Sequence, residues 1–309
     1  MAGGVTGTTA MDDRRPLVMG AAAGYEPGKV RLFLQSLVAT GFQGTLVFFI
    51  YRSQETATRE LVRKYAPGLD VELVKIRGIR EHAKLVRSCI KRLFAMMPAE
   101  SIPSLKRRLL RFQGMPHVTR YFHYADYLAK HDAFSRVLLS DVRDVVFQSD
   151  PFLGWSSGLY LGMENPALTI ATEPFDREWI MDAYGEAMLA RIGSQQVSCS
   201  GVTFGDVNSI KKYIDQILAE TLWQPFSKMK TRIYDQAFHN KLLHEGELAD
   251  VHLCQPLRSP IATLGCLDPA AFTLADGFLL NEDGRPAPIV HQYDRHSVLV
   301  KAFEQRMPA

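Results

Sequence analysis

Two aspartates interrupt an otherwise apolar stretch at residues 136–152, which reads RVLLSDVRDVVFQSDPF. Asp141 and Asp144 follow a run typical of a buried β-strand, where acidic residues lower strand propensity and cost desolvation energy. Hard divalent cations prefer carboxylate oxygens, so the pair predicts a metal site. Side chains at i and i+3 of a straight strand point to opposite faces, so both can reach one ion only if the chain bends after Asp141. The alternative is a turn in which the two acids cap the backbone or pair with Arg143.

Three later segments contain further residues that could bind a ligand or a metal ion. Ser200 and Gly201 are predicted to form a tight turn before a strand, where glycine permits close approach of a ligand. Asp235 and Gln236 lie near a predicted helix start, where an acid also simply complements the helix dipole. His291 ends a late apolar strand, and a histidine there is either a metal ligand or an ordinary core or surface residue.

Strands and helices that would position these residues alternate along the first part of the chain. Apolar residues spaced i, i+3, i+4, i+7 and i+8 predict a helix between Pro27 and Gly41, and a second helix is predicted at 54–68. Buried strands are predicted from Pro16 into a small-residue loop ending at Tyr25, and at 45–50, 71–76 and 136–141. This alternation indicates βαβ units and a parallel sheet, whose carboxyl edge is where ligands bind. Asp141 is predicted to lie at that edge.

The rest of the chain is predicted to continue the same domain. Helices are expected at 118–131, 176–193, 207–222 and 232–246, and strands at 158–164, 168–173, 196–206, 249–254 and 287–294. Mixed strand pairing is expected after Gly154. No linker separates two halves, so we expect a loose leader at 1–14 and a single domain at 15–309, with a basic helical insert at about 77–117.

Composition sets broad limits on function. The chain has 309 residues, 47% of them hydrophobic, and a formal charge of +3, which is typical of globular proteins and gives no reason to expect nucleic-acid binding. Its four cysteines form no C-x-x-C pair, which favours free thiols and a reducing compartment. The sequence lacks a signal peptide and any apolar run near the roughly 18 residues of a membrane span, so we expect a cytoplasmic protein.

Taken in order, the motifs resemble nucleotide-diphospho-sugar transferases of the GT-A fold, especially the retaining glycogenin/galactosyltransferase-like group. The resemblance covers roughly residues 16–297 and rests on the small-residue loop, RYFHYADYL, LLSDVRDVVFQSDPF, SGVTFGD, DQAFHN and VHQYD. It implies a single α/β domain whose central, mostly parallel but mixed sheet is flanked by helices. It also implies metal-assisted transfer of a sugar, with retention, from a nucleotide-diphosphate sugar to a glycan, lipid-linked or small-molecule acceptor.

The resemblance also implies which residues form the site. Asp144, Asp141 and His291 would hold Mn²⁺ or Mg²⁺, and the imidazole favours Mn²⁺. The family's first metal-binding aspartate would fall on Val142, and Asp141 takes its place here. Asp235 would hold the hydroxyls of the donor sugar, and Gln236 would lie near its anomeric carbon. The expected donor-binding residues are Ala21, Ala22, Ala23, Gly24, Tyr25, Arg120, Asp141, Arg143, Ser200 and Gly201.

Other functions remain as alternatives. One is a nucleotide-sugar-binding protein without turnover, suggested by the shifted aspartate. Another is an inverting transferase in which Asp235 acts as the general base. A dinucleotide oxidoreductase and a P-loop enzyme are disfavoured, because the chain has neither G-x-G-x-x-G nor G-x-x-x-x-G-K-[ST]. An aspartate-nucleophile phosphatase would need its aspartates at the first strand, which has none.

The basic insert at about 77–117 has two interpretations. It forms either a solvated helical face that covers the sheet or a peripheral surface for anionic lipid or a polyanionic acceptor. The second interpretation places the protein at the inner face of the membrane. The contact would then run through Lys106, Arg107, Arg108 and Arg111.

Overall fold

A seven-stranded mixed sheet forms the centre of the computed structural model, which describes residues 15–229, 232 and 234–308. Its strands, in spatial order, are β3 (Asp70–Ile76), β2 (Thr45–Tyr51), β1 (Arg15–Ala21), β4 (Phe134–Ser140), β7 (Ser198–Asp206), β6 (Leu159–Met163) and β8 (Val251–Cys254). The first four are parallel, β7 runs antiparallel to both neighbours, and β8 is parallel to β6. The predicted α/β class, with a mostly parallel but mixed sheet, is confirmed.

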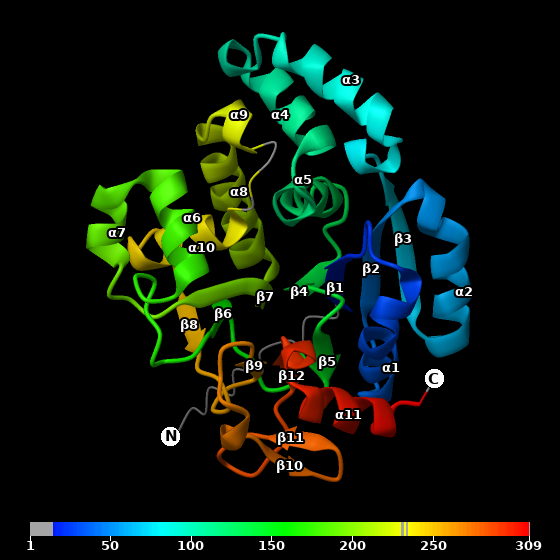
Figure 1. The fold of residues 1–309 in the computed structure, drawn as a ribbon. Coiled ribbons are helices and arrows are strands. Elements are labelled where there is room, and N and C mark those ends of the chain that lie inside the picture. The colour runs from blue at the N-terminus through cyan, green and yellow to red at the C-terminus, as the bar shows by residue number, and fades with distance from the viewer. Residues whose placement is uncertain (1–14, 230–231, 233, 309) are drawn as a thin grey trace, which may run out of the picture.

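Helices cover both faces of this sheet (Figure 1). Helices α5 (Pro116–Leu128), α8 (Val207–Trp223) and α10 (Asp235–His244) lie on one face, while α1 (Arg31–Ala39) and α2 (Glu55–Tyr65) lie on the other. Residues of β1 alternate between the two cores: Leu17 and Met19 pack with the α5 side and Val18 with the α1 side. Strands buried on both faces are expected to be apolar throughout, and every residue of β2 is buried.

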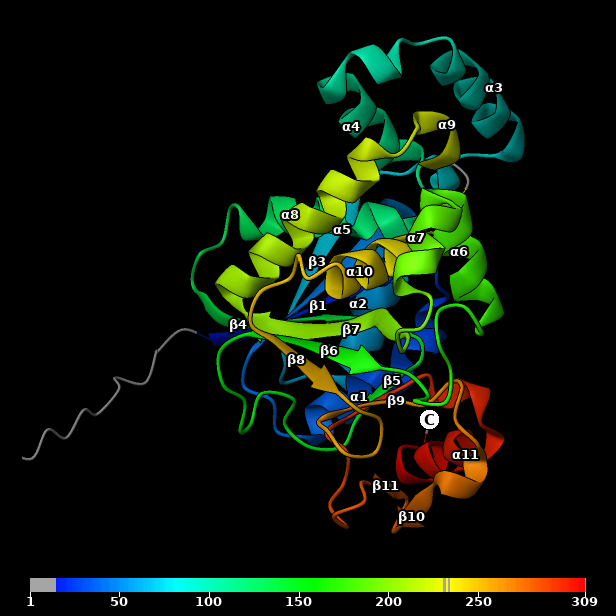
Figure 2. The same ribbon diagram turned by 90° about the vertical axis from the view of Figure 1, so that its left-hand side faces the viewer.

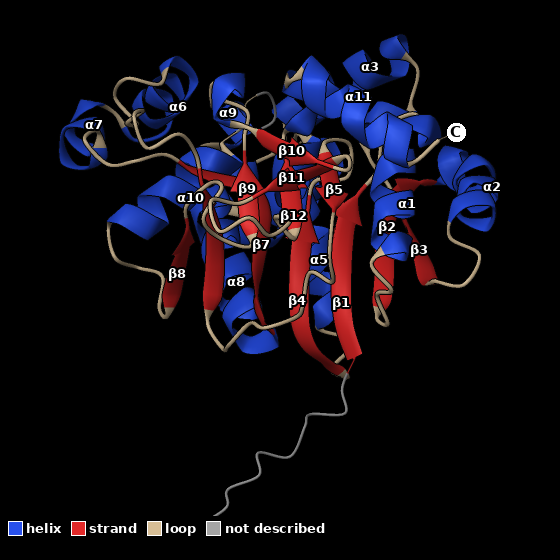
Figure 3. Ribbon diagram, turned by 90° about the horizontal axis from the view of Figure 1, so that it is seen from below, coloured by secondary structure: helices blue, strands red, loops and turns tan. Residues whose placement is uncertain are grey.

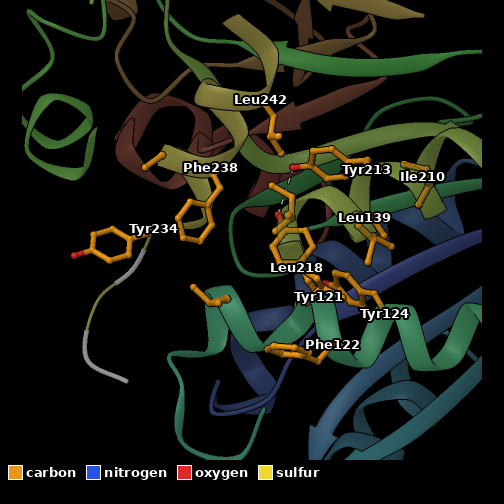
Figure 4. Close-up of a cluster of buried hydrophobic side chains, with 14 of the residues drawn as sticks. Tyr121, Phe122, Tyr124, Leu139, Ile210, Tyr213, Leu218, Tyr234, Phe238 and Leu242 are labelled. Carbon is orange, nitrogen blue, oxygen red and sulfur yellow. Dashed lines mark hydrogen bonds between the residues drawn. The ribbon is translucent and has the colours of Figure 1, made fainter. Parts of the chain in front are cut away.

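The core on the α5 side is aromatic (Figure 4). Tyr121 and Tyr124 of α5 are almost completely buried, and they pack in one cluster with Leu139 of β4 and Tyr213 of α8. Edge-to-face ring pairs join Tyr121 to both Tyr124 and Tyr213. This packing fixes α5 against β4, and both elements contribute to the candidate site.

A smaller three-stranded sheet lies near the ends of β1 and β4 (Figure 3). In it β12 (Ile289–His291) pairs antiparallel with β5 (Val145–Phe147) and parallel with β9 (Ile261–Thr263). The hairpin of β10 (Thr273–Ala275) and β11 (Phe278–Leu280) packs with α11 (Ser297–Arg306), and both lie below this sheet in Figure 1. This sheet brings the C-terminal part of the chain to the carboxyl end of β4.

The basic insert folds as two helices that project above α5 (Figures 1 and 2). They are α3 (Lys84–Ala95) and α4 (Pro103–Gln113), and the short α9 (Phe226–Met229) packs against α4. Turns of 3-10 helix lie at Pro27–Val30, Arg52–Gln54, Ile79–Glu81, Ala99–Ser101, Pro269–Ala271 and Tyr293–Arg295. Within the described residues, no helix is both long and apolar enough to span a membrane. The predicted leader at 1–14 lies outside the described residues.

Two predicted elements differ from the structure. The segment 168–173 is not a strand, because the hydroxyl of Thr172 accepts a hydrogen bond from the Thr169 amide and closes a turn, leaving only an isolated bridge from Thr169 to Gln196. The predicted helix 176–193 is two helices, α6 (Pro174–Tyr184) and α7 (Glu186–Ile192). Gly185 separates them with φ 82°, a conformation that stops an α-helix.

Candidate functional site

Ligand atoms of Asp141, Asp144 and His291 converge at the carboxyl end of β4, all within 4.8 Å of one another. The chain bends after Asp141 as the sequence predicts, because β4 ends at Ser140 and β5 begins in the other sheet at Val145. In that sheet His291 is the register partner of Val145, which places the imidazole beside the bend. We call these three residues the triad.

The side chain at position 142 belongs to the core and not to the triad. Val142 is fully buried and packs with Leu138 and Phe48 on the α1 side of the sheet. The neighbouring Asp141 side chain is 29% exposed and faces His291. Because successive residues of an extended chain point to opposite sides, only position 141 can supply a ligand at this point.

His291 has the surroundings of a metal ligand. Its side chain is 1% exposed, and neither ring nitrogen has a hydrogen-bond partner among the described residues. The nearest acid is Asp141, whose Oδ2 lies 3.8 Å from Nε2. Buried polar atoms without partners are costly and rare in folded proteins, and a cation at the triad would give a partner to one of the two ring nitrogens. One imidazole with two carboxylates suits Mn²⁺ better than Mg²⁺.

Gly201 makes room for the triad. A Cβ atom at this position would lie 2.4 Å from Cε1 of His291 and 2.8 Å from Oδ2 of Asp141. The Gly201 carbonyl also accepts a hydrogen bond of 2.7 Å from the Asp141 amide. The predicted tight turn at Ser200 and Gly201 is wrong: both lie inside β7, where the pairing with β6 shifts register as in a β-bulge.

Arg120 of α5 links the triad to a second acid. Its guanidinium forms ion pairs with Asp141 and, at 2.9 Å, with Asp235, and it donates to the carbonyl of Ser200 at 3.3 Å. Burial raises the pKa of Asp141, but Arg120, together with His291 and His117, outweighs this effect and holds that pKa well below the usual range. Asp141 therefore stays ionised, with one oxygen on Arg120 and the other facing His291.

Asp235 and Gln236 open helix α10, as the sequence predicts. The Asp235 carboxylate is buried and also accepts a hydrogen bond of 3.2 Å from the Ser200 hydroxyl. The Gln236 amide donates to Asp176 at 3.0 Å and to Glu164 at 3.3 Å. Both predicted catalytic side chains are therefore held by partners within the protein.

The acids that hold Gln236 were not predicted. Burial, together with the charge of Glu164, raises the pKa of Asp176 to about 8, so Asp176 is mostly protonated at neutral pH. Asp176 lies in the first turn of α6 and Glu164 directly follows β6, so no spacing in the sequence connects them. Only the fold brings the two together.

A cavity of about 650 Å³ opens beside Asp141 and Arg120. Of the predicted nucleotide-binding loop, Ala21, Ala23, Gly24 and Tyr25 line it, whereas Ala22 is buried in the α1-side core. The unpredicted Gln54 fixes this loop, because its side chain accepts from the Gly24 amide at 3.0 Å and donates to the Tyr25 carbonyl. The loop is therefore anchored before any ligand binds.

The remaining predicted residues lie outside the cavity lining, whereas Asp141 and Arg120 are part of it. Asp144, Ser200, Gly201, Asp235, Gln236 and His291 do not line the cavity. Arg143 does not line it either, and its half-exposed side chain pairs with Asp144 at 3.5 Å and with Asp294 at 3.2 Å. Arg80, Arg87 and His117, which were not assigned to a donor site, line the part of the cavity formed by the insert.

The four basic residues that were expected to contact anionic lipid or a polyanionic acceptor lie on α4. Lys106 is 7% exposed and pairs with Glu100 at 2.8 Å, so its charge is not available at the surface. Arg107 lies over the ring of Phe122, and Arg111 pairs with Asp126. Arg108 is exposed.

Comparison with known proteins gives no relative. No protein-family model matches the chain, and no curated protein matches it significantly. The function of the site therefore has to be argued from its own residues.

Proposed function

We propose that the chain is a metal-assisted glycosyltransferase that moves a sugar, with retention, from a nucleotide-diphosphate sugar to an acceptor. The observation that carries this proposal is the convergence of Asp141, Asp144 and the unpartnered, buried His291 beside a cavity lined by Arg120. The cavity volume of about 650 Å³ falls within the range of about 300–1,000 Å³ usual for small-molecule sites.

Each part of the site has a role suited to its chemistry. The triad would hold a divalent cation, which when bound offsets the charge that develops on a departing diphosphate. Arg120 supplies a fixed positive charge at the cavity wall and orients Asp141. The loop at Ala21–Tyr25, held by Gln54, presents backbone groups to the nucleoside. Asp235, which Arg120 holds just outside the cavity lining, would orient the sugar hydroxyls once the donor is bound.

Retention is favoured over inversion by the contacts of Asp235. An inverting transferase needs a general base within hydrogen-bond reach of the acceptor hydroxyl. Asp235 is buried, and the same oxygen atom is engaged by Arg120 at 2.9 Å and by Ser200 at 3.2 Å. A carboxylate held in this way is better suited to orienting a substrate than to accepting its proton.

A nucleotide-sugar-binding protein without turnover is the second candidate. It is favoured by the internal contacts of the predicted catalytic pair, since both Asp235 and Gln236 already have partners in the protein. Donor hydrolysis distinguishes the two candidates, because a binding protein would be stabilised by the nucleotide sugar without cleaving it.

The test is a screen of nucleotide sugars for binding and hydrolysis, with and without Mn²⁺. We expect Mn²⁺-dependent hydrolysis of at least one donor, and a loss of about 100-fold or more in Asp144→Asn. Asp144 is the cleaner position to change, because its side chain pairs only with the half-exposed Arg143, whereas Asp141→Asn also weakens the buried pair with Arg120. Asp215→Asn, which removes an exposed carboxylate from α8, is the matched control.

Two results would count against the proposal. Hydrolysis by Asp144→Asn at the rate of the control would exclude the triad as the metal site. If a nucleotide sugar binds but is not hydrolysed at any Mn²⁺ concentration tested, the result favours the binding protein instead.

A further inference from the structure

A second hollow lies between α3 and the end of α4. It adjoins the cavity beside Asp141 and Arg120, which we call the donor cavity. Its volume is about 440 Å³, and we call it the α3 groove. The polar side chains that line it are Arg80, Lys84, Arg87, Ser88, Lys91 and Gln113.

The α3 groove is strongly cationic. Lys84, Arg87, Ser88 and Lys91 are spaced i, i+3, i+4 and i+7, so they share one face of α3, and that helix contains no acidic residue. Among the described residues, none of the four lining cations forms an ion pair, and no acid lines the groove. The nearby carboxylate of Glu81 accepts hydrogen bonds from the backbone amides of Arg52 and Gly78 and forms no ion pair with the lining cations of the groove.

Gln113 gives a second, independent indication of a ligand. Its side chain is 2% exposed and lines the groove, yet neither its amide oxygen nor its amide nitrogen has a partner among the described residues. A buried amide in this state has lost its water without a replacement, which costs free energy. An oxygen-rich anion in the groove would accept from the surrounding cations, and also from the Gln113 nitrogen when that amide turns toward the groove.

The groove is continuous with the donor cavity. Arg80, Arg87 and Met115 line both, so a ligand anchored in the groove extends toward Asp141 and Arg120. The donor diphosphate belongs beside the triad, at the other side of that cavity. The groove therefore joins that cavity on the side formed by the insert, where Arg80, Arg87 and Met115 line both.

We propose that the α3 groove binds the phosphate group of a phosphate-ester acceptor, so that the acceptor hydroxyl lies in the donor cavity. This inference rests on the proposed function for the reaction, but the phosphate site itself can be tested without turnover. Four unpaired cations around a buried amide suit a compact dianion better than a single carboxylate, which one arginine would satisfy.

The phosphate could be carried by a soluble ester or by a lipid. Apolar side chains are exposed on the same helix and directly after it, with Leu85 82%, Leu93 56% and Met96 84% exposed. Apolar and basic residues on one helix are typical of contact with an anionic membrane. The experiment therefore includes one arm for each source.

The first arm measures binding of inorganic phosphate by calorimetry, with the nucleotide diphosphate and Mn²⁺ present at saturation. We expect Gln113→Leu, and separately the double variant Lys84→Gln with Lys91→Gln, to weaken phosphate binding by about tenfold, since neither lysine lines the donor cavity. Gln113→Leu should fold normally, because it removes an unsatisfied amide from a buried site. Lys301→Gln, which removes an exposed charge from α11, is the control and should bind like the wild type.

The second arm measures co-sedimentation with phosphatidylcholine vesicles that contain phosphatidic acid, which exposes a phosphomonoester, or phosphatidylserine. Preference for phosphatidic acid that is lost in the groove variants identifies a lipid-borne phosphate, whereas binding of inorganic phosphate alone identifies a soluble ester. Both results support the phosphate site.

The proposal is overturned if phosphate and phosphatidic acid fail to bind, or if the nucleotide diphosphate displaces them completely. It is equally overturned if the groove variants bind phosphate as tightly as Lys301→Gln. Donor hydrolysis is measured in parallel on the same variants and should be retained. If the wild type shows no donor hydrolysis, this result counts against the proposed glycosyltransferase but not against the phosphate site.

Discussion

Gly201→Ala is the most direct test of the triad, because it adds one methyl group where three side chains meet. The new Cβ would lie 2.4 Å from Cε1 and 2.6 Å from Nε2 of His291, and 2.8 Å from Oδ2 of Asp141. The φ angle of Gly201 is not positive, so alanine causes steric overlap without backbone strain. The imidazole and the carboxylate must therefore move apart, which disperses the three ligand atoms.

The cost of this methyl group can be estimated. Overpacking of a filled interior costs about 1–3 kcal/mol. For a chain of 309 residues, the unfolding entropy of about 0.65 kcal/mol/K makes each kcal/mol equivalent to about 1.5 °C in Tm. Gly201→Ala should therefore lower Tm by about 1.5–5 °C without metal.

The larger effect is expected on metal binding. A cation at about 100 times its Kd stabilises the folded wild type by about 2.7 kcal/mol, which is about 4 °C in Tm. Gly201→Ala should lose most of this gain, since its ligand atoms no longer converge. Differential scanning fluorimetry with a Mn²⁺ titration measures both effects and needs no substrate.

Gly68→Ala is the matched control for this experiment. A Cβ at Gly68 would meet no atom within 4 Å, and its φ is not positive either. That variant should keep the wild-type Tm and the wild-type response to Mn²⁺. If Gly201→Ala gained as much from Mn²⁺ as Gly68→Ala did, the ion would bind elsewhere and the triad would not be the metal site.

Two further predictions concern the buried acids. Asp176→Asn should stabilise the protein at pH 8 but not at pH 4. The folded pKa of Asp176 is raised to about 8, so between about pH 4 and pH 8 the unfolded wild type releases a proton that the folded protein keeps. The stability of the wild type therefore falls as the pH rises through this range, and the variant lacks this loss. Thermal unfolding across that range checks this, and a Tm difference between variant and wild type that does not change with pH would refute it. Asp235→Ala should lower stability by about 3–5 kcal/mol, because it leaves the buried Arg120 with one fewer partner, whereas Asp235→Asn should cost less since its amide oxygen still accepts from Arg120. Loss of donor turnover in both variants, assayed well below their Tm, supports contact with the sugar; wild-type turnover in Asp235→Asn would reduce the residue to a structural role.

The regular elements could be predicted because their patterns are local. The apolar run of β2 and the 3.6-residue periodicity of α1 each depend only on neighbouring residues, and both elements lie where they were expected. Predictions failed where a single residue or a tertiary contact determines the local secondary structure. The Thr169–Thr172 turn replaces a strand that propensity favours, and Gly185 divides a segment whose periodicity is otherwise helical.

The candidate site was predictable to the extent that strand ends determine it. Asp141 follows β4 and His291 ends β12, and the three-stranded sheet brings His291 to the carboxyl end of β4. Arg120 was predicted as a basic residue facing the donor, but its simultaneous pairing with Asp141 and Asp235 joins residues 115 positions apart. No sequence spacing encodes such a contact, because it depends on how α5 packs against β4 and α10.

In the proposed glycosyltransferase the first metal-binding aspartate stands at 141 and not at 142, and the two positions face different sides of the chain. Val142 fills the core so tightly that its Cγ1 would lie 2.4 Å from a Cβ at Gly20 of the neighbouring strand. A carboxylate at 142 would therefore enter an apolar core, where burial of a charge is strongly unfavourable. At position 141 the carboxylate meets both a buried arginine and the imidazole of His291, which provide the compensation that an acid in this stretch requires. Arg120 therefore offsets the charge of the acid that interrupts the apolar run, and His291 places a second possible ligand beside it.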